Sequence, residues 1–329
     1  MVTFTESDIY NSFILFVKPF FDRLNWKEYI FYLHSFYLYL FALVMALAVL
    51  VVLVFFAVKK KKSGRTQIHR KQDTEEPSSA SESGILAAAH QHIGTREDQQ
   101  DSYGVSEPGD YACKGVVAVV ADGMGGLANG RAVSSALVRS MLDGFANASS
   151  QQNAADFLLE QAVRANMGVN QMLRGQERSG STLVSCVIRE GKLHFLTVGD
   201  SRIYLYRGGA LIQLNREHIY QEELAVKAVN QGASLQQVRS DRQAHALTSY
   251  FGIGRIPSID RNDEPVKLLN GDKILLASDG VFGTLSQEQM EQAMAQSVTM
   301  AARTMGEQIL DAKRVHQDNN TAVILEYRA

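Results

Sequence analysis

A run of 23 residues without a charge, residues 36–58, constrains this chain more than any other feature. As an α-helix rising about 1.5 Å per residue, it would be about 34 Å long and would cross the hydrocarbon core of a bilayer. Strongly polar side chains are missing from every face, which argues against a buried helix of a soluble core. The run is also too long, and begins too far from the N-terminus, for a cleaved signal peptide. The sequence therefore predicts one transmembrane helix.

Basic residues flank this predicted helix unevenly. Lys18, Arg23 and Lys27 precede it, whereas seven basic residues lie within residues 59–71. Because cytoplasmic flanks carry the excess of lysine and arginine, the C-terminal side is expected in the cytoplasm. Residues 1–35 then form an extracytoplasmic or interfacial segment. Residues 59–84 form a linker that is first basic and then polar.

Net charge separates the linker from the remainder. The whole chain carries −2, residues 1–58 carry −1 and residues 59–76 carry +4, so residues 77–329 carry −5. A mildly acidic body is not expected to bind nucleic acid, because a phosphate backbone attracts a basic surface. The two cysteines, Cys113 and Cys186, lie far apart in the sequence, which excludes a disulfide framework and agrees with a reducing compartment.

Residues 85–329 alternate strand-like and helix-like patterns. Short runs rich in β-branched or aromatic residues predict strands at residues 116–120, 182–188, 193–198, 203–206, 274–277 and 321–326. Apolar residues at helical spacing predict helices at residues 129–145, 154–172, 287–295 and 300–312, the third of them capped by Ser286. Consecutive hairpins imply antiparallel sheets, and paired helices imply that helices cover the sheet faces. A layered α+β domain is therefore expected.

Five aspartates stand at the ends of predicted strands or in turns. They are Asp101, Asp122, Asp200, Asp279 and Asp318. Each of them alone is explained at least as well as an ordinary turn residue. Together they would supply the oxygen ligands that Mg²⁺ and Mn²⁺ prefer, and a pair of such ions activates water for in-line attack on a phosphate ester.

Taken in order, the segments around these aspartates resemble the metal-dependent serine/threonine protein phosphatases of the PP2C type, in their bacterial form. The matching segments are Gly94-Thr95-Arg96 with Asp101, Val120-Ala121-Asp122-Gly123-Met124-Gly125-Gly126, Gly180-Ser181-Thr182, Val198-Gly199-Asp200-Ser201-Arg202, Leu247-Thr248 with Gly252, Ala277-Ser278-Asp279-Gly280 and Asp318-Asn319-Asn320-Thr321. The resemblance covers roughly residues 86–327, and so many ordered motifs leave little room for a chance match. It implies that residues 85–329 form a four-layer α-β-β-α sandwich, whereas the single transmembrane helix predicted before them lies outside the resemblance.

The resemblance also implies how metal ions would be held. Asp122 would bridge two Mn²⁺ or Mg²⁺ ions, and the carbonyl of Gly123 would ligate one of them. Asp279 and Asp318 would complete the shell of the other ion. These four residues would form the core of the site.

Three further residues would act around that core. Asp101 would act near the ions through water, and Asp200 would help to hold a third, weaker ion. Arg96 would bind the substrate phosphate with its planar fork of donors. The implied function is hydrolysis of phosphoserine and phosphothreonine in a protein substrate, in partnership with a cognate kinase. The anchor would contact lipid in the inner membrane of a bacterium, with the catalytic domain in the cytoplasm.

One departure from the family pattern motivates an alternative. Members usually carry a glutamate where this chain has Gln100, which follows Gln99. The chain could thus be a degenerate PP2C-fold module that binds a phosphoprotein or a scaffold without efficient catalysis, whereas a third possibility keeps the enzyme and makes its substrate a small phosphorylated regulator. The complete set Asp122, Asp279 and Asp318 favours catalysis. Restoring the glutamate by Gln100→Glu is expected to tighten metal binding or to change it little.

The segment of residues 221–245 lies between two family motifs and is polar. It is interpreted as a variable flap that confers substrate preference. His218, just before it, is interpreted as a structural or exposed histidine, with a role beside the flap as the alternative.

Overall fold

The structure, a computed structural model, describes residues 84–329 apart from residues 126–128, 175–178, 233, 235, 237, 239–240 and 242. The predicted segments 1–35 and 36–58, and the linker up to residue 83, lie outside the described residues. Among the helices that the structure does describe, none is long and apolar enough to cross a membrane. The transmembrane helix therefore stays a prediction from the sequence.

The strands pair into two sheets. Sheet I has the order β1 (Gly84–His92), β12 (Asn320–Arg328), β11 (Lys273–Ala277), β7 (Arg202–Arg207) and β8 (Ala210–Gln213). Sheet II has the order β10 (Val266–Lys267), β6 (Lys192–Val198), β5 (Leu183–Arg189), β3 (Val116–Met124) and β2 (Asp101–Val105), with β4 (Gly180–Ser181) beside β3 and β9 (Asp260–Arg261) beside β6. Neighbouring strands run antiparallel in both sheets, as the consecutive hairpins predict.

Strand β3 shows why both faces of sheet II are buried. Its residues 116, 118 and 120 belong to the apolar cluster between the two sheets. The intervening residues Val117, Val119 and Ala121 belong to a second cluster, on the outer face of the sheet. Each fully buried valine stabilises the fold by about 1.5–3 kcal/mol relative to an exposed position. A continuous apolar run therefore gives a central strand, covered on both sides.

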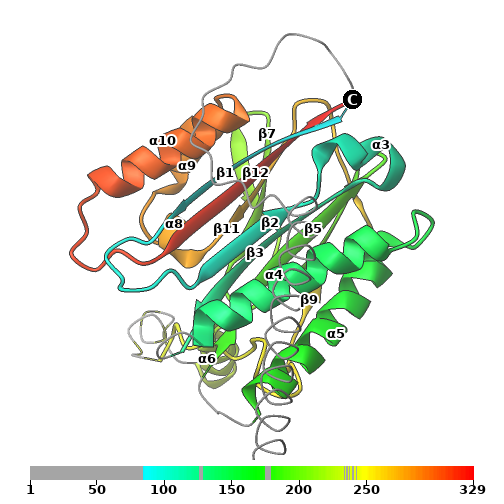
Figure 1. Cartoon of the computed structure of the whole chain (residues 1–329). Helices are drawn as coiled ribbons and strands as arrows, with labels where there is room; N and C mark the ends of the chain where they lie inside the picture. Colours follow the sequence, from blue (N-terminus) through cyan, green and yellow to red (C-terminus); the bar gives the residue numbers. More distant parts are fainter. Residues whose placement is uncertain are drawn as a thin grey trace, which may run out of the picture. The chain divides into compact units, whose positions relative to one another are not determined.

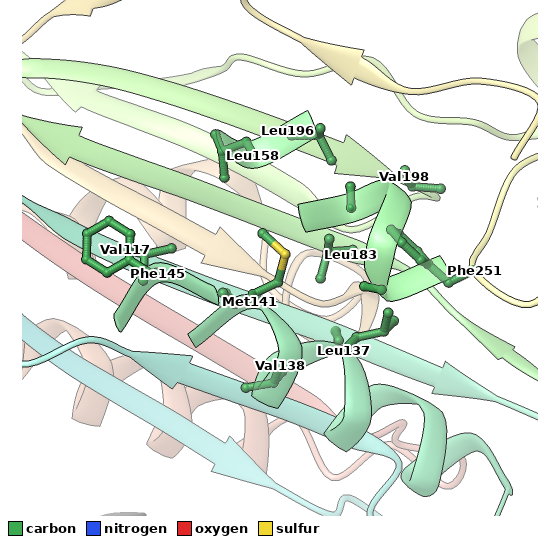
Figure 2. Close-up of a cluster of buried hydrophobic side chains, with 14 of the residues drawn as sticks. Val117, Leu137, Val138, Met141, Phe145, Leu158, Leu183, Leu196, Val198 and Phe251 are labelled. Atoms are coloured by element: carbon green, nitrogen blue, oxygen red, sulfur yellow. The ribbon is translucent and has the colours of Figure 1, made fainter. Parts of the chain in front are cut away.

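Helices α4 (Asn129–Asn147) and α5 (Ala154–Leu173) cover the outer face of sheet II (Figure 1). Figure 2 shows the side chains of this cluster, in which Met141 and Phe145 of α4 lie beside the strands. Phe145 also packs edge-to-face against Phe157 of α5, with 5.5 Å between the ring centroids. The predicted helices 129–145 and 154–172 are therefore confirmed as one helical layer.

Helices α8 (Asp279–Phe282), α9 (Gln287–Met294) and α10 (Val298–Asp311) lie on the outer face of sheet I (Figure 1). Ser286 caps α9 as predicted: its side chain accepts a hydrogen bond from the amide of Gln289, whose side chain accepts one from Ser286. The layers follow the order helices, sheet, sheet, helices. In the described residues, this is the sandwich that the family resemblance implies.

Two further helical segments lie away from these layers. The short helix α3 (Tyr111–Lys114) follows a 3₁₀ turn at Pro108–Asp110. Helix α6 (Tyr220–Gln231) occupies the first part of the segment that the sequence analysis interprets as a flap. All the predicted strands and helices of this region are present, whereas strands β1, β2, β4, β8, β9 and β10 and helices α3, α6 and α8 were not predicted.

Candidate metal centre

Asp122 lies near the end of β3, in the layer between the two sheets. Residues 116, 118 and 120 face sheet I, and because side chains alternate along a strand, Asp122 faces the same way. Asp101, the first residue of β2, is its register partner across the antiparallel pair. Register partners point to the same face of a sheet. Two carboxylates therefore meet at one end of the inter-sheet core.

Asp101 connects the two sheets. Its side chain is buried, and its Oδ2 accepts hydrogen bonds from the hydroxyls of Ser278 and Thr321, each at 2.8 Å. Both donors come from sheet I, because Ser278 follows β11 and Thr321 belongs to β12. The other oxygen of Asp101, Oδ1, is buried without a hydrogen-bond partner. A cation could satisfy such an oxygen.

The backbone of Asp122 is held by the motif Gly180-Ser181-Thr182. The amide of Asp122 donates to Thr182 Oγ1 at 3.1 Å, and the amide of Thr182 donates to the Asp122 carbonyl at 2.9 Å. The Ser181 hydroxyl donates to that same carbonyl at 2.9 Å. These three bonds fix the direction in which the Asp122 side chain leaves β3.

Gly123, the predicted carbonyl ligand, lies where three segments of backbone come together. A Cβ on this residue would stand 2.4 Å from the carbonyl oxygen of Gly130 and 2.6 Å from that of Gln100. No side chain fits there, so the end of β3 requires glycine at this position.

Asp279 and Asp318 bring two more carboxyl groups from sheet I. Asp279 is the first residue of α8, and its Oδ1 is also buried without a partner. Asp318 precedes β12; its Oδ1 accepts from the amide of Asn319 at 2.8 Å, and its Oδ2 accepts from Arg96 at 2.6 Å. Gly280 permits the close packing of the two segments, since a Cβ there would lie 2.0 Å from the Asn319 carbonyl oxygen.

Burial and mutual repulsion raise the pKa of these carboxyl groups. Burial, followed by the charges of Asp101 and Asp279, raises the pKa of Asp122 well above its ordinary value of 3.8. Burial raises the pKa of Asp101 to about 7, although its two hydroxyl donors oppose the shift. The pKa of Asp279 is raised by burial and then by the charge of Asp318. A buried cluster of like charges requires bound protons or cations.

Asp200 lies in the turn between β6 and β7, beside this cluster. Burial and then the charge of Asp279 raise its pKa to about 7. Gly199, at φ +104°, makes the turn, and its amide donates to Nδ1 of His218 at 3.0 Å. Burial lowers the pKa of His218, which keeps that ring nitrogen an acceptor. His218 therefore holds the Asp200 turn, in agreement with its interpretation as a structural residue.

Asn319 was not singled out from the sequence, yet it holds the loop before β2. Its Oδ1 accepts from the amide of Gln100 at 2.7 Å, and its Nδ2 donates to two loop carbonyls at 2.8 and 3.1 Å. Ser278 and Thr321 were likewise given no role. All three residues lie inside segments that resemble the family, so the motifs contained the signal even though their contacts could not be read from it.

The donor set fits hard divalent cations. The charges of the other four predicted aspartates all raise the pKa of Asp122, which places the five in one cluster, and every side-chain metal donor in it is an oxygen. Within the described residues, however, no three histidine, cysteine, aspartate or glutamate side chains form a preassembled ion cage. One reason is that Arg96 occupies Oδ2 of Asp318. An ion bound there would therefore displace Arg96.

Comparison with known proteins points to the same family. The model of the family Protein phosphatase 2C matches residues 89–316. The serine/threonine phosphatase stp of Listeria innocua is 25% identical over 222 residues, which cover 63% of this chain and 82% of that protein.

Solved structures share the fold. The PPM Ser-Thr phosphatase MsPP of Mycobacterium smegmatis, in complex with cacodylate, aligns with a TM-score of 0.61 at 29% identity, covering 75% of this chain and 100% of MsPP. The catalytic domain of the phosphatase PstP, in complex with two manganese ions, aligns with a TM-score of 0.60 at 22% identity, covering 75% of this chain and 99% of that domain. Because the family model spans well over half of the chain, and the motifs that resemble it converge at one site, the chain belongs to the protein phosphatase 2C family of serine/threonine phosphatases.

Proposed function

We propose that this chain is an active phosphatase that hydrolyses phosphoserine and phosphothreonine in proteins, with two core metal ions and a third bound more weakly. The observation that carries the proposal is the cluster of aspartates at the ends of β2, β3, β11 and β12, in which Oδ1 of Asp101 and Oδ1 of Asp279 are buried without a hydrogen-bond partner among the described residues. Phosphatases of this family use Mn²⁺ or Mg²⁺, and PstP was solved with two manganese ions.

The core residues would hold the ions from both sheets. Asp122 and the Gly123 carbonyl would hold them from sheet II, and Asp279 and Asp318 from sheet I. The bound ions would activate a water molecule as the nucleophile and offset the charge of the phosphate. Asp101 would orient the site by its bonds to sheet I.

Arg96 would guide the phosphate. Its side chain is more than half exposed, at 59%, and can turn from Asp318 toward a phosphate group while the Asp318 carboxylate turns to an ion. Asp200, at the edge of the cluster, would hold the third ion. The residue roles expected from the resemblance are compatible with these positions.

A binding-only module is the second candidate, motivated by Gln99 and Gln100. It has less support, because Asp122, Asp279 and Asp318 are all present and clustered. The relatives found by comparison are named phosphatases as well.

We also propose that residues 36–58 anchor the enzyme in the bacterial inner membrane, with lipid around the helix and the catalytic domain in the cytoplasm. The support is the uncharged run and the basic residues that follow it, both of which are features of the sequence. The substrate would then be a phosphorylated protein at or near the membrane, modified by a cognate serine/threonine kinase.

Hydrolysis of phosphopeptides by the full chain in detergent micelles tests the catalytic proposal. Phosphate release from phosphoserine and phosphothreonine peptides is expected with Mn²⁺ or Mg²⁺ and should stop with EDTA. The variant Asp279→Asn is the control for a contaminating phosphatase. Purified on the same column, it should release no phosphate. Binding of phosphopeptide without hydrolysis, at any metal concentration, would favour the binding-only module.

A further inference from the structure

Gln100, the residue that departs from the family pattern, contacts several parts of the site. Its amide donates to Asn319 Oδ1 at 2.7 Å, and its carbonyl accepts from the amide of Gly123 at 3.2 Å and from the Ser134 hydroxyl at 2.5 Å. Its side-chain Nε2 donates to the carbonyl of Gly125 at 3.3 Å. Gln100 therefore ties the end of β3 to α4 and to the segment before β12.

The side chain has little freedom to move from this position. A Cβ on Gly130, in the first turn of α4, would lie 2.8 Å from Gln100 Oε1 and 3.0 Å from its Cδ. The glutamine amide is thus packed against the helix on one side while it bonds to Gly125 on the other. The missing side chain of Gly130 leaves the space that the Gln100 amide fills.

The hydrogen-bond chemistry at this place differs between glutamine and glutamate. The Gly125 carbonyl is an acceptor, and an amide nitrogen can donate to it, whereas an ionised carboxylate has no proton to donate. A glutamate in the same rotamer would set two oxygens against each other. Its carboxylate would have to leave the position, and the end of β3 would lose a support.

We propose that Gln100 is a positioning residue of this phosphatase: its side-chain amide holds the Gly125 carbonyl and so fixes the end of β3, which presents Asp122 and the Gly123 carbonyl to metal. The inference rests on the proposed function, because it gives the end of β3 a role in ion binding. It reverses the expectation drawn from the family pattern, in which the glutamine is a missing ligand.

Gln99 provides a matched control. Its Oε1 accepts a hydrogen bond from the amide of Asp101 at 3.0 Å. A carboxylate accepts that bond as well as an amide oxygen does. Gln99→Glu and Gln100→Glu therefore add the same charge one residue apart, and both replace an amide nitrogen by an oxygen, but among the described residues only the Gln100 nitrogen donates a hydrogen bond.

Calorimetric titration of the full chain in micelles with Mn²⁺ alone tests the inference. Gln100→Glu and the uncharged Gln100→Met should each weaken Mn²⁺ binding by about 3- to 10-fold, the loss expected for one hydrogen bond. Gln99→Glu should bind Mn²⁺ at least as tightly as the natural chain. Tighter binding by Gln100→Glu would overturn the inference and restore the missing-ligand interpretation.

A second readout requires no metal. Hydrogen exchange in the metal-free chain should be faster in a peptide covering residues 122–125 for both Gln100 variants, and unchanged for Gln99→Glu. Equal exchange in all four proteins would refute the positioning role. If the natural chain binds no Mn²⁺, the proposed function fails. The hydrogen-exchange rates still decide whether Gln100 holds the end of β3.

Discussion

The guanidinium of Arg96 donates a hydrogen bond of 2.6 Å to Asp318, so the residue proposed to bind phosphate is paired with a residue proposed to bind metal. Both side chains are largely exposed, at 59% and 38%, and such pairs contribute about 0–1 kcal/mol to stability. Arg96→Ala should therefore leave the urea midpoint almost unchanged, yet lower kcat/KM for a phosphopeptide by about 10- to 100-fold. Arg303→Ala, which breaks an exposed pair with Glu307 on α10, should change neither quantity. An unaltered kcat/KM in Arg96→Ala would contradict the phosphate-binding role.

Removing one core carboxylate should have opposite effects on activity and on the stability of the metal-free chain. Asp122→Asn and Asp279→Asn should abolish turnover and the rise in Tm on adding Mn²⁺, because a ligand charge is lost. The metal-free variants should be more stable than the natural chain at about pH 8, by on the order of 1 kcal/mol, since a buried repulsive charge is removed. Asp263→Asn, at an exposed position, is the control. Near-normal rates in Asp279→Asn at saturating Mn²⁺ would mean that the core site is wrongly assigned.

The stability of the metal-free chain should depend on pH through Asp101 and Asp200, because their pKa values are raised to about 7. In the unfolded chain the pKa is near the ordinary value of 3.8, so the folded state binds protons more tightly. Their contribution to stability is then fully present below that ordinary value and is lost as the pH rises through about 7.

Two measurements follow from this titration. Urea denaturation of the metal-free chain should show stability falling from about pH 4 to about pH 7, with a shallower fall in Asp200→Asn. Mn²⁺ affinity should rise over the same range, with proton release detectable by calorimetry in buffers of different ionisation enthalpy. Identical pH profiles for the natural chain and Asp200→Asn would argue against the raised pKa of Asp200.

Thr321→Val tests the hydroxyl that reaches Asp101 from β12. Valine has nearly the same shape but cannot donate, so the variant should lose about 1–3 kcal/mol of stability and about tenfold or more in Mn²⁺ affinity. Thr197→Val is the matched control, because Thr197 is a buried threonine of β6 whose hydroxyl accepts only a long bond of 3.4 Å from Asn215. If both variants bound Mn²⁺ equally well, the Thr321 hydroxyl would have no role in orienting Asp101.

Reporter fusions test the proposed membrane topology. A fluorescent reporter at the C-terminus should be bright and an alkaline-phosphatase reporter there should be inactive, because the seven basic residues after the helix favour the cytoplasm. Neutral substitutions at residues 59–62 should weaken this orientation without changing peptide hydrolysis. The opposite reporter pattern in the natural chain would place the C-terminal domain outside the cytoplasm.

Strands covered on both faces could be predicted from the sequence, and strand β1 could not. Residues 116–120 and 274–277 are continuous apolar runs, which require burial on two sides. Strand β1 instead contains three consecutive alanines and ends in His90, Gln91 and His92, which have no strong strand preference. It forms a strand because nine of its residues pair in register with β12. Pairing partners more than 200 residues away leave no local pattern.

In the candidate site too, local motifs could be read from the sequence and long-range contacts could not. The aspartates could be found because Asp122, Asp200 and Asp279 each adjoin a glycine in a short motif, and because Asp101 and Asp318 lie in segments that resemble the family. The bond from Gln100 to Asn319 and the pair of Arg96 with Asp318 join residues 219 and 222 positions apart, so only the fold reveals them. From the sequence, Gln100 could be interpreted only by comparison with the glutamate that is usual in the family. In the structure, its side chain donates a hydrogen bond to the Gly125 carbonyl.

The hydrogen bonds from Ser278 and Thr321 to Asp101 join the two sheets at the end where the aspartates cluster. Ions held between Asp122 and Asp279 would add a second connection at that same end. When the ions leave, the sandwich should open there first, and backbone that proteases cannot otherwise reach should become a substrate for them. In a cell short of manganese, the enzyme would then be degraded faster as well as being idle, so that metal supply controls how many copies survive.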